Sequence, residues 1–213
     1  MYFSSHNSLV LENQRLKLDS LALKGELQKL DSVLQENEQL RKLLHAGESN
    51  NTSYRVAGIL KVDPDPFSHQ IVIDKGEAHS VKAGQAIIDD NGLMGTVIAK
   101  SNYTSNVMLI SDASSAIPVE NIRNGIRAIA MGTGNINLLK LKHITNTADI
   151  KVGDILATSG LGGKLPAGFP VAKVTDVEID PSKPFAIVYL APLASLEKNR
   201  HVLLVDVPEE SNG

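Results

Sequence analysis

The chain has 213 residues, a formal net charge of −3 and no cysteine. The lack of cysteine excludes disulfides, zinc–thiolate sites and cysteine nucleophiles. Lysine and arginine are scattered among acidic residues, so the basic stripe typical of nucleic-acid-binding proteins is absent and no nucleic-acid partner is expected. The length suffices for an extended helix followed by one or two small domains.

The first predicted element is a coiled-coil helix over residues 1–46. Leucines recur every seven residues from Leu9, and further apolar residues follow at intervals of three or four, which is the spacing of a coiled-coil seam. The predicted dimer seam comprises Leu9, Asn13, Leu16, Leu23, Leu27, Leu30, Asn37, Leu40 and Leu44. A buried Asn in such a seam lowers stability but selects register and a two-stranded partner, so a homodimer is expected.

A single amphipathic helix folded back on its own β-domain is the alternative interpretation. The seam spans about four heptads and the rest of the chain supplies no second helix, which favours a partner chain. Gly47 ends the helix, and residues 47–53 form a polar linker.

From Tyr54 onward the sequence consists of short apolar runs separated by Gly, Pro, Asp and Asn. Strands at regular spacing, without helical periodicity between them, are typical of barrels or sandwiches. The predicted fold class is therefore mainly β: an N-terminal coiled-coil helix followed by two small β-barrel-like domains. The expected strands are 54–62, 70–74, 85–88, 93–99, 106–110, 127–131, 136–142, 155–158, 171–179, 186–190 and 202–207.

The β-region also contains an internal echo. Residues 81–87 (VKAGQAI) are similar to residues 150–156 (IKVGDIL), and a strand follows at a comparable distance in each case. This predicts two related domains, 54–115 and 116–207, with a tail over 208–213. The last strand of the second domain could return to the first. Barrel faces and unpaired strand edges are the expected contact surfaces.

The stretch 149–171 is the most distinctive part of the sequence, and it includes the run Ser159-Gly160-Leu161-Gly162-Gly163-Lys164-Leu165-Pro166-Ala167-Gly168-Phe169-Pro170. It closely resembles the hallmark stretch of the MreC family of rod shape-determining proteins. Residues 36–44, 63–67, 71–76, 92–97 and 109–112 resemble other segments of that family in the same order. The predicted hallmark turn, with a structural role, comprises Gly153, Asp154, Ser159, Gly160, Gly162, Gly163, Pro166, Gly168 and Pro170.

This resemblance implies a non-catalytic periplasmic scaffold of the cell-elongation machinery, which maintains cell shape by organising or activating peptidoglycan synthesis. The implied partners are a class-B penicillin-binding transpeptidase, MreD, RodZ and, indirectly, MreB, together with a homodimer and higher self-assembly. Members of the family sit in the bacterial inner membrane by a single helix, with the bulk of the chain periplasmic. No run here approaches the ~20 apolar residues of such a helix. We therefore expect this sequence to be part of a longer protein.

The alternative is a degenerate chymotrypsin-like or cell-wall hydrolase with an oligomerising stalk. Ser159 lies in a glycine-rich turn, and His69, His79 or His143 could supply a base, but no nucleophile signature surrounds the serine. The run 162–164 lacks the Ser or Thr that completes a phosphate-binding loop. The histidines lack the spacing of metal ligands. No catalytic residue, cofactor site or metal site is therefore predicted.

Overall fold

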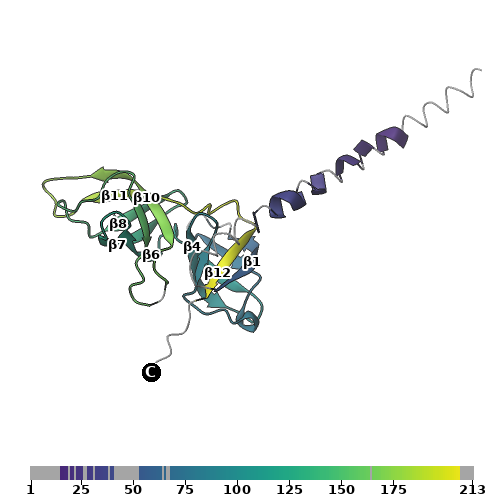
Figure 1. Cartoon of the computed structure of the whole chain (residues 1–213), viewed down its shortest axis with the longest axis horizontal. Helices are drawn as coiled ribbons and strands as arrows, with labels where there is room; N and C mark the ends of the chain where they lie inside the picture. The colour runs from purple at the N-terminus through teal and green to yellow at the C-terminus, as the bar shows by residue number, and fades with distance from the viewer. Residues whose placement is uncertain are drawn as a thin grey trace, which may run out of the picture. The chain divides into compact units, whose positions relative to one another are not determined.

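The structure, a computed structural model, describes residues 15–18, 20–21, 23–25, 28–30, 32–37, 39–40, 53–63, 65, 68–163 and 165–206. The described residues between 15 and 40 are helical, and the strands begin at Ser53 (Figure 1). The N-terminal helix and the β-body belong to separate units, so each is described by itself. Within the described residues, no helix combines the length and the apolar composition needed to cross a membrane.

The described part of the N-terminal helix exposes most of its leucines in the single chain. Of the predicted seam, Leu16, Leu23 and Leu30 are 61%, 60% and 53% exposed, respectively. Asn37 and Leu40 are also helical, whereas Leu9, Asn13, Leu27 and Leu44 lie outside the described residues. Burying one leucine side chain stabilises a protein by roughly 1.5–3 kcal/mol. Pairing with an apolar partner would therefore stabilise this helix. Leu18 and Leu21, outside the predicted seam, are exposed as well.

Replacing Leu23 and Leu30 by lysine is expected to give a folded monomer, because each copy would place two charges in the paired seam. Sedimentation velocity of the full chain measures this directly. Leu18→Lys with Leu21→Lys is the matched control, since the same change is made at exposed leucines outside the predicted seam. The control should remain dimeric, and dimers that survive the seam substitutions would locate the pairing in the β-body.

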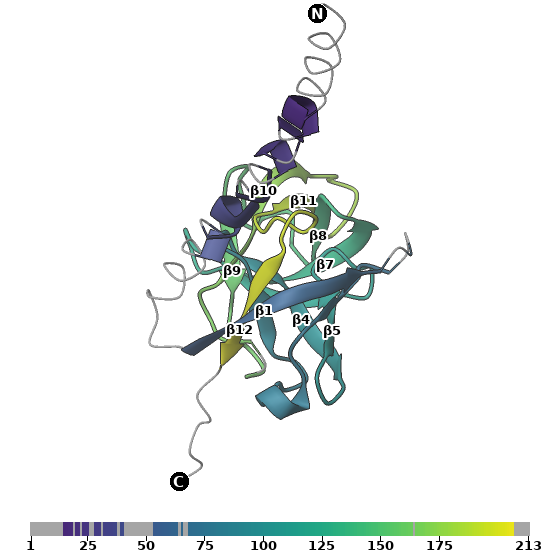
Figure 2. The same cartoon turned by 90° about the vertical axis from the view of Figure 1, so that its right-hand side faces the viewer.

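The β-body consists of two closed, antiparallel, six-stranded barrels, which confirms the predicted fold class (Figures 1 and 2). Barrel 1 contains β1 (Ser53–Val62), β2 (Gln70–Ile73), β3 (Ala86–Ile88), β4 (Leu93–Lys100), β5 (Ser105–Leu109) and β12 (His201–Asp206), with a short 3-10 turn at Glu77–His79. Barrel 2 contains β6 (Ala116–Asn121), β7 (Arg127–Asn135), β8 (Leu138–Lys142), β9 (Ile155–Thr158), β10 (Pro170–Glu178) and β11 (Ile187–Pro192).

Every barrel strand has a hydrogen-bonded neighbour on both sides, because each sheet closes on itself. The expectation that unpaired strand edges would bind other copies is therefore wrong for the described barrels. Closure removes the exposed row of backbone groups that strand addition requires. Among the described residues, barrel faces, turns and the helix remain as surfaces for contacts with partners.

The internal echo corresponds to a duplicated topology. Around the barrels, the order β3-β4-β5-β2-β1-β12 matches β9-β10-β11-β8-β7-β6. Gly84 and Gly153 have φ values of 83° and 95°, and their N–H groups donate to Val97 and Val174 at 2.7 and 2.9 Å. The strand register also shifts directly after both valines. The equivalent turns and bulges show that the repeat is structural.

The last strand, β12, lies in barrel 1, between β1 and β3, although the sequence assigned residues 116–207 to the second domain with a possible return. The first repeat supplies only β1 to β5 in sequence, and β12 takes the position that β6 occupies in barrel 2. Its residues Val202 to Val205 are at most 1% exposed. Because Ser53 pairs with Asp206, the two ends of the described body lie on neighbouring strands.

The strand β6 was not predicted from the sequence, because Pro118 lies at its centre and proline cannot donate a ladder hydrogen bond. Pairing of β6 with β9 begins at Val119, so Pro118 lies at the end of that ladder. Its carbonyl accepts from the N–H of Ser159 at 3.1 Å. The strand therefore tolerates the proline without losing a central bond.

The hallmark segment and the junction between the barrels

The turn at the start of the hallmark segment is held by a charged cluster around Asp154. The Asp154 carboxylate accepts from Arg123 Nε at 2.7 Å, Asn121 Nδ2 at 2.6 Å and the N–H of Lys151 at 3.0 Å. Arg123 Nη1 also donates to Asp149 at 2.7 Å. These bonds from Arg123 hold the pKa of Asp154 well below its usual range and lower the pKa of Asp149 to about 2. Pairing with the carboxylates raises the pKa of Arg123.

Acid is expected to weaken this cluster. A folded pKa below the unfolded value of ~3.9 gives stability that is present above that value and lost as pH falls toward the folded pKa. The loss should therefore begin near pH ~4; the part due to Asp149 continues to about 2, its folded pKa, and the part due to Asp154 continues to lower pH. Arg123→Gln should be destabilised at neutral pH and should approach the wild type as pH falls. Urea midpoints at a series of pH values test this, and a difference that stays constant with pH would contradict it.

Barrel 1 carries a related cluster at the equivalent turn. Gln85 Nε2 donates to the carbonyl of Val205 at 3.0 Å and to Asp206 at 2.7 Å, and Arg55 Nε donates to Asp206 at 2.9 Å. In each barrel, a largely buried polar side chain on the turn binds the end of the neighbouring strand. Asp206 thus fixes the last described residues of β12.

The rest of the hallmark segment folds as a loop supported by Thr158. The buried Thr158 hydroxyl donates to the carbonyl of Pro166 at 2.6 Å and accepts from the N–H of Phe169 at 3.0 Å. Gly160, Gly162, Gly163 and Gly168 have φ values between 66° and 90°. Such values favour glycine, so these residues shape the loop. Pro170 then begins β10.

Ser159 does not form a catalytic triad. Its hydroxyl accepts from the N–H of Leu161 at 3.4 Å and has no hydrogen bond to His69, His79 or His143. Among the described residues, a serine–histidine contact joins Ser111 Oγ to His69 Nδ1 at 2.8 Å, a pair that the sequence did not indicate. Ser111 is fully buried and therefore cannot reach a substrate. No group of three potential metal ligands occurs in the part of the chain that the structure describes.

A buried carboxylate, that of Asp89, joins barrel 1 to the segment that returns from barrel 2. Asp89 is 2% exposed, and one of its oxygens accepts from the N–H groups of Asn91 and Gly92 at 2.8 and 2.9 Å. The other oxygen accepts from the N–H of Ser195 at 2.7 Å and from Asn199 Nδ2 at 2.9 Å. The sequence did not indicate these last two partners of Asp89, because they are distant from it along the chain.

Two glycines allow close approach of backbone at the junction between the barrels. A Cβ on Gly92 would overlap the carbonyl oxygen of Pro170, where the hallmark segment enters β10. A Cβ on Gly132 would overlap the carbonyl oxygen of Asp112, in the connection from β5 to β6. The junction is therefore closed by direct backbone packing in two places. Figure 1 shows β4 of barrel 1 and β10 of barrel 2 on the facing sides of the two barrels.

Two duplicated barrels, joined at such a junction and preceded in sequence by a leucine-rich helix, define a tandem-barrel protein. Residues 59–206, which span both barrels, match the family model described as "Rod shape-determining protein MreC, barrel core". The chain belongs to the MreC family.

The chain is 41% identical over 202 residues to the cell shape-determining protein MreC of Escherichia coli (strain K12), covering 95% of this chain and 55% of that protein. It thus spans about half the length of this relative. A solved structure of MreC is similar with a TM-score of 0.79 and 45% identity, over 82% of this chain and 99% of that one. A structure described as a complex between Penicillin-Binding Protein (PBP2) and MreC from Helicobacter pylori shares the fold, with a TM-score of 0.59 and 21% identity, over 74% of this chain and 99% of that one.

Proposed function

We propose that this chain is the periplasmic part of a non-catalytic scaffold that maintains cell shape within the cell-elongation machinery. The observation that carries this proposal is the family match across both barrels, together with the relative from Escherichia coli named for cell shape determination. The structural role of the glycines around Ser159 favours a scaffold over a hydrolase.

The proposed partner is a class-B penicillin-binding transpeptidase, since the Helicobacter pylori relative is described in complex with PBP2. MreD, RodZ and, indirectly, MreB complete the proposed assembly. The chain would pair through the helix seam and be held in the bacterial inner membrane by a single membrane helix. With four Phe, four Tyr and no Trp, the chain is poor in the aromatic anchors of tight interfaces. Modest affinity is therefore expected.

Restoration of cell shape tests the proposal. The full chain, fused behind a membrane helix, is produced in a rod-shaped bacterium depleted of its own MreC, and cell length and width are measured. Rods are expected from the wild-type chain and equally from Ser159→Ala. Spherical cells from a folded Ser159→Ala chain, with labelling of wild-type Ser159 by a serine-directed probe, would instead establish the hydrolase alternative.

A further inference from the structure

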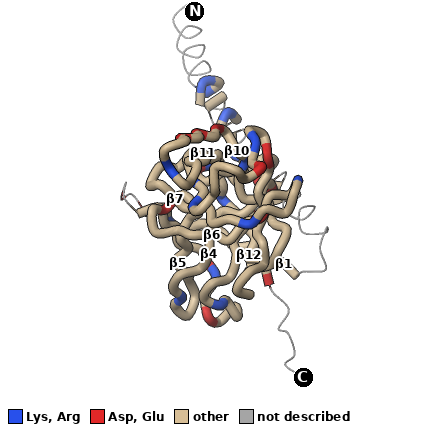
Figure 3. Tube along the Cα trace, turned by 90° about the vertical axis from the view of Figure 1, so that its left-hand side faces the viewer, with Lys and Arg blue, Asp and Glu red and all other residues tan. Residues whose placement is uncertain are grey.

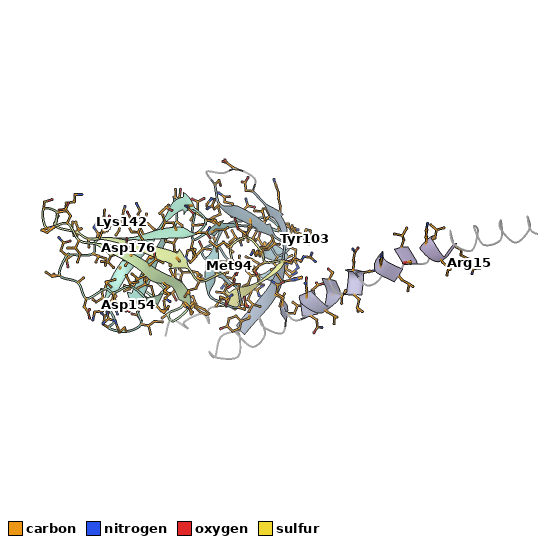
Figure 4. All side chains as sticks on the ribbon, turned by 90° about the horizontal axis from the view of Figure 1, so that it is seen from above. Arg15, Met94, Tyr103, Lys142, Asp154 and Asp176 are labelled. Carbon is orange, nitrogen blue, oxygen red and sulfur yellow. The ribbon has the colours of Figure 1, made fainter. Side chains whose placement is uncertain are left out.

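One part of the outer face of barrel 2 carries charges sorted by sign onto separate strands, whereas Lys173, also exposed on β10, lies beyond it, opposite Ala191. On β10, Asp176 and Glu178 are exposed, and on β8, Lys140 and Lys142 are exposed. Between these strands lies β11. Figure 4 shows Lys142 and Asp176 on the same barrel, and Figure 3 shows both signs of charge over it.

The strand register aligns these side chains in two rows. Tyr189 on β11 lies opposite Asp176 on one side and Lys140 on the other. In the neighbouring row, Ile187 lies opposite Glu178, and the same register places Lys142 on its other side. Each row therefore reads acid, apolar, lysine across β10, β11 and β8.

Within one chain these charges do not form ion pairs, either with one another or with other described residues. An acid and a lysine in the same row are separated by two strand spacings, about 10 Å, which is too far for an ion pair. Lys140 instead lies over the ring of Tyr189, with Nζ 5.1 Å from the ring centroid. Elsewhere on this barrel, Glu120 pairs with Arg127 at 3.9 Å and Asp180 with Lys183 at 3.3 Å.

We propose that this face, defined by Lys140, Lys142, Asp176, Glu178, Ile187 and Tyr189, binds the same face of a second copy of this chain about a two-fold axis running along β11. Rotation about that axis keeps each row opposite the same row of the other copy, and it places β8 of one copy opposite β10 of the other. Lys140 then meets Asp176 of the other copy, and Lys142 meets Glu178. The residues of β11 meet their own counterparts, as a two-fold interface requires.

The charge pattern also selects between the two symmetric ways to stack the faces. A two-fold axis running across the strands would instead place each strand opposite the same strand of the other copy and exchange the two rows. Lysine would then face lysine and acid would face acid, a juxtaposition that costs several kcal/mol at an interface. The axis along β11 is therefore the favoured arrangement.

The contact is expected to be weak and sensitive to salt. A barrel face is convex, so three strands at about 4.8 Å spacing bury little area. Exposed ion pairs are screened by salt. This inference rests on the self-association within the proposed function. Another contact, such as the helix seam, would raise the local concentration of one barrel 2 face around the other.

Disulfide trapping in the full chain tests the arrangement. The chain has no cysteine, so Ile187→Cys places a single thiol on the proposed axis, where it meets its own counterpart. Val152→Cys is the control, on an exposed turn of the same barrel (64% exposed). Under mild oxidation at low salt, Ile187→Cys should cross-link and Val152→Cys should not. Equal cross-linking of both, or none by Ile187→Cys, would overturn the proposal.

Charge reversal gives a second, compensating test in the Ile187→Cys chain. Lys140→Glu with Lys142→Glu makes the face wholly acidic, and Asp176→Lys with Glu178→Lys makes it wholly basic. Each alone should lose cross-linking about tenfold, and an equimolar mixture should regain it, because opposite faces then pair. The proposal would be overturned if charge reversal left cross-linking unchanged, or if the mixture cross-linked no better than either variant alone.

Binding of a class-B transpeptidase by the same variants distinguishes pairing between copies from the proposed function. Retained transpeptidase binding with lost cross-linking is the expected result. If the Ile187→Cys chain does not cross-link and its charge-reversal variants lose transpeptidase binding, this face binds the transpeptidase. Pairing between copies through this face would then be overturned. The proposed function would survive that outcome, since it is tested separately by cell shape.

Discussion

A chain that ends at Arg200 is expected to lose barrel 1 while keeping barrel 2. Without β12, the edges of β1 and β3 are unpaired and barrel 1 cannot close. The deletion also removes four buried apolar side chains, each worth roughly 1.5–3 kcal/mol of burial. Barrel 2 keeps all six of its strands, from β6 to β11. Limited proteolysis with mass spectrometry should therefore yield a resistant fragment close to residues 116–192.

The matched control for this truncation ends at Asp206, which removes only the residues after β12. It should resist proteolysis as the full chain does. If the chain ending at Arg200 keeps barrel 1 protected, or if both barrels are lost together, β12 does not close barrel 1 independently of barrel 2. Leu204→Ala provides a milder version of the test, since this fully buried side chain should cost about 2–5 kcal/mol when truncated.

Replacing Asp89 by alanine is expected to destabilise the β-body by more than about 3 kcal/mol. The change removes the acceptor from three backbone N–H groups and from Asn199 Nδ2. The N–H of Gly92 is buried and would carry its full desolvation cost, and the other three donors are partly buried. The released segment 193–200 should lose protection against hydrogen exchange, together with β12, which follows it. Urea denaturation and hydrogen exchange of the full chain measure both effects.

Asp90→Ala is the matched control, because Asp90 is the exposed neighbour on the same turn. Its carboxylate accepts only from the side chain of Asn91, at 3.0 Å. The control should change stability by no more than about 0.5 kcal/mol. Equal effects of the two substitutions would show that Asp89 acts only as a turn residue and does not hold the return segment.

The repeat and most of the strands could be predicted, because local patterns in the sequence encode them. The echo between 81–87 and 150–156 predicted the repeat, because each motif builds its own turn from a glycine with positive φ. Apolar runs located eleven of the twelve strands, and Pro118 hid the remaining one, β6. The return of β12 was foreseen only as a possibility, because its apolar residues would suit either barrel.

The long-range contacts could not be predicted in the same way. Asp89 lies 106 and 110 residues from Ser195 and Asn199, and nothing local marks them as partners. Asp154 was singled out as a turn residue, whereas its partner Arg123, 31 residues earlier, was not. The sorted charges on β10 and β8 become visible only when the strand register is known. The resemblance of 149–171 identified the family without indicating which surface binds a partner.

The most direct test of the central claim is the affinity of the full chain for the periplasmic part of a class-B penicillin-binding transpeptidase. We expect saturable binding in the micromolar range, because the chain has few aromatic anchors. The variant with Leu23→Lys and Leu30→Lys, measured alongside, reports whether pairing of the helices is needed. No binding by the folded wild-type chain at any accessible concentration would contradict the account.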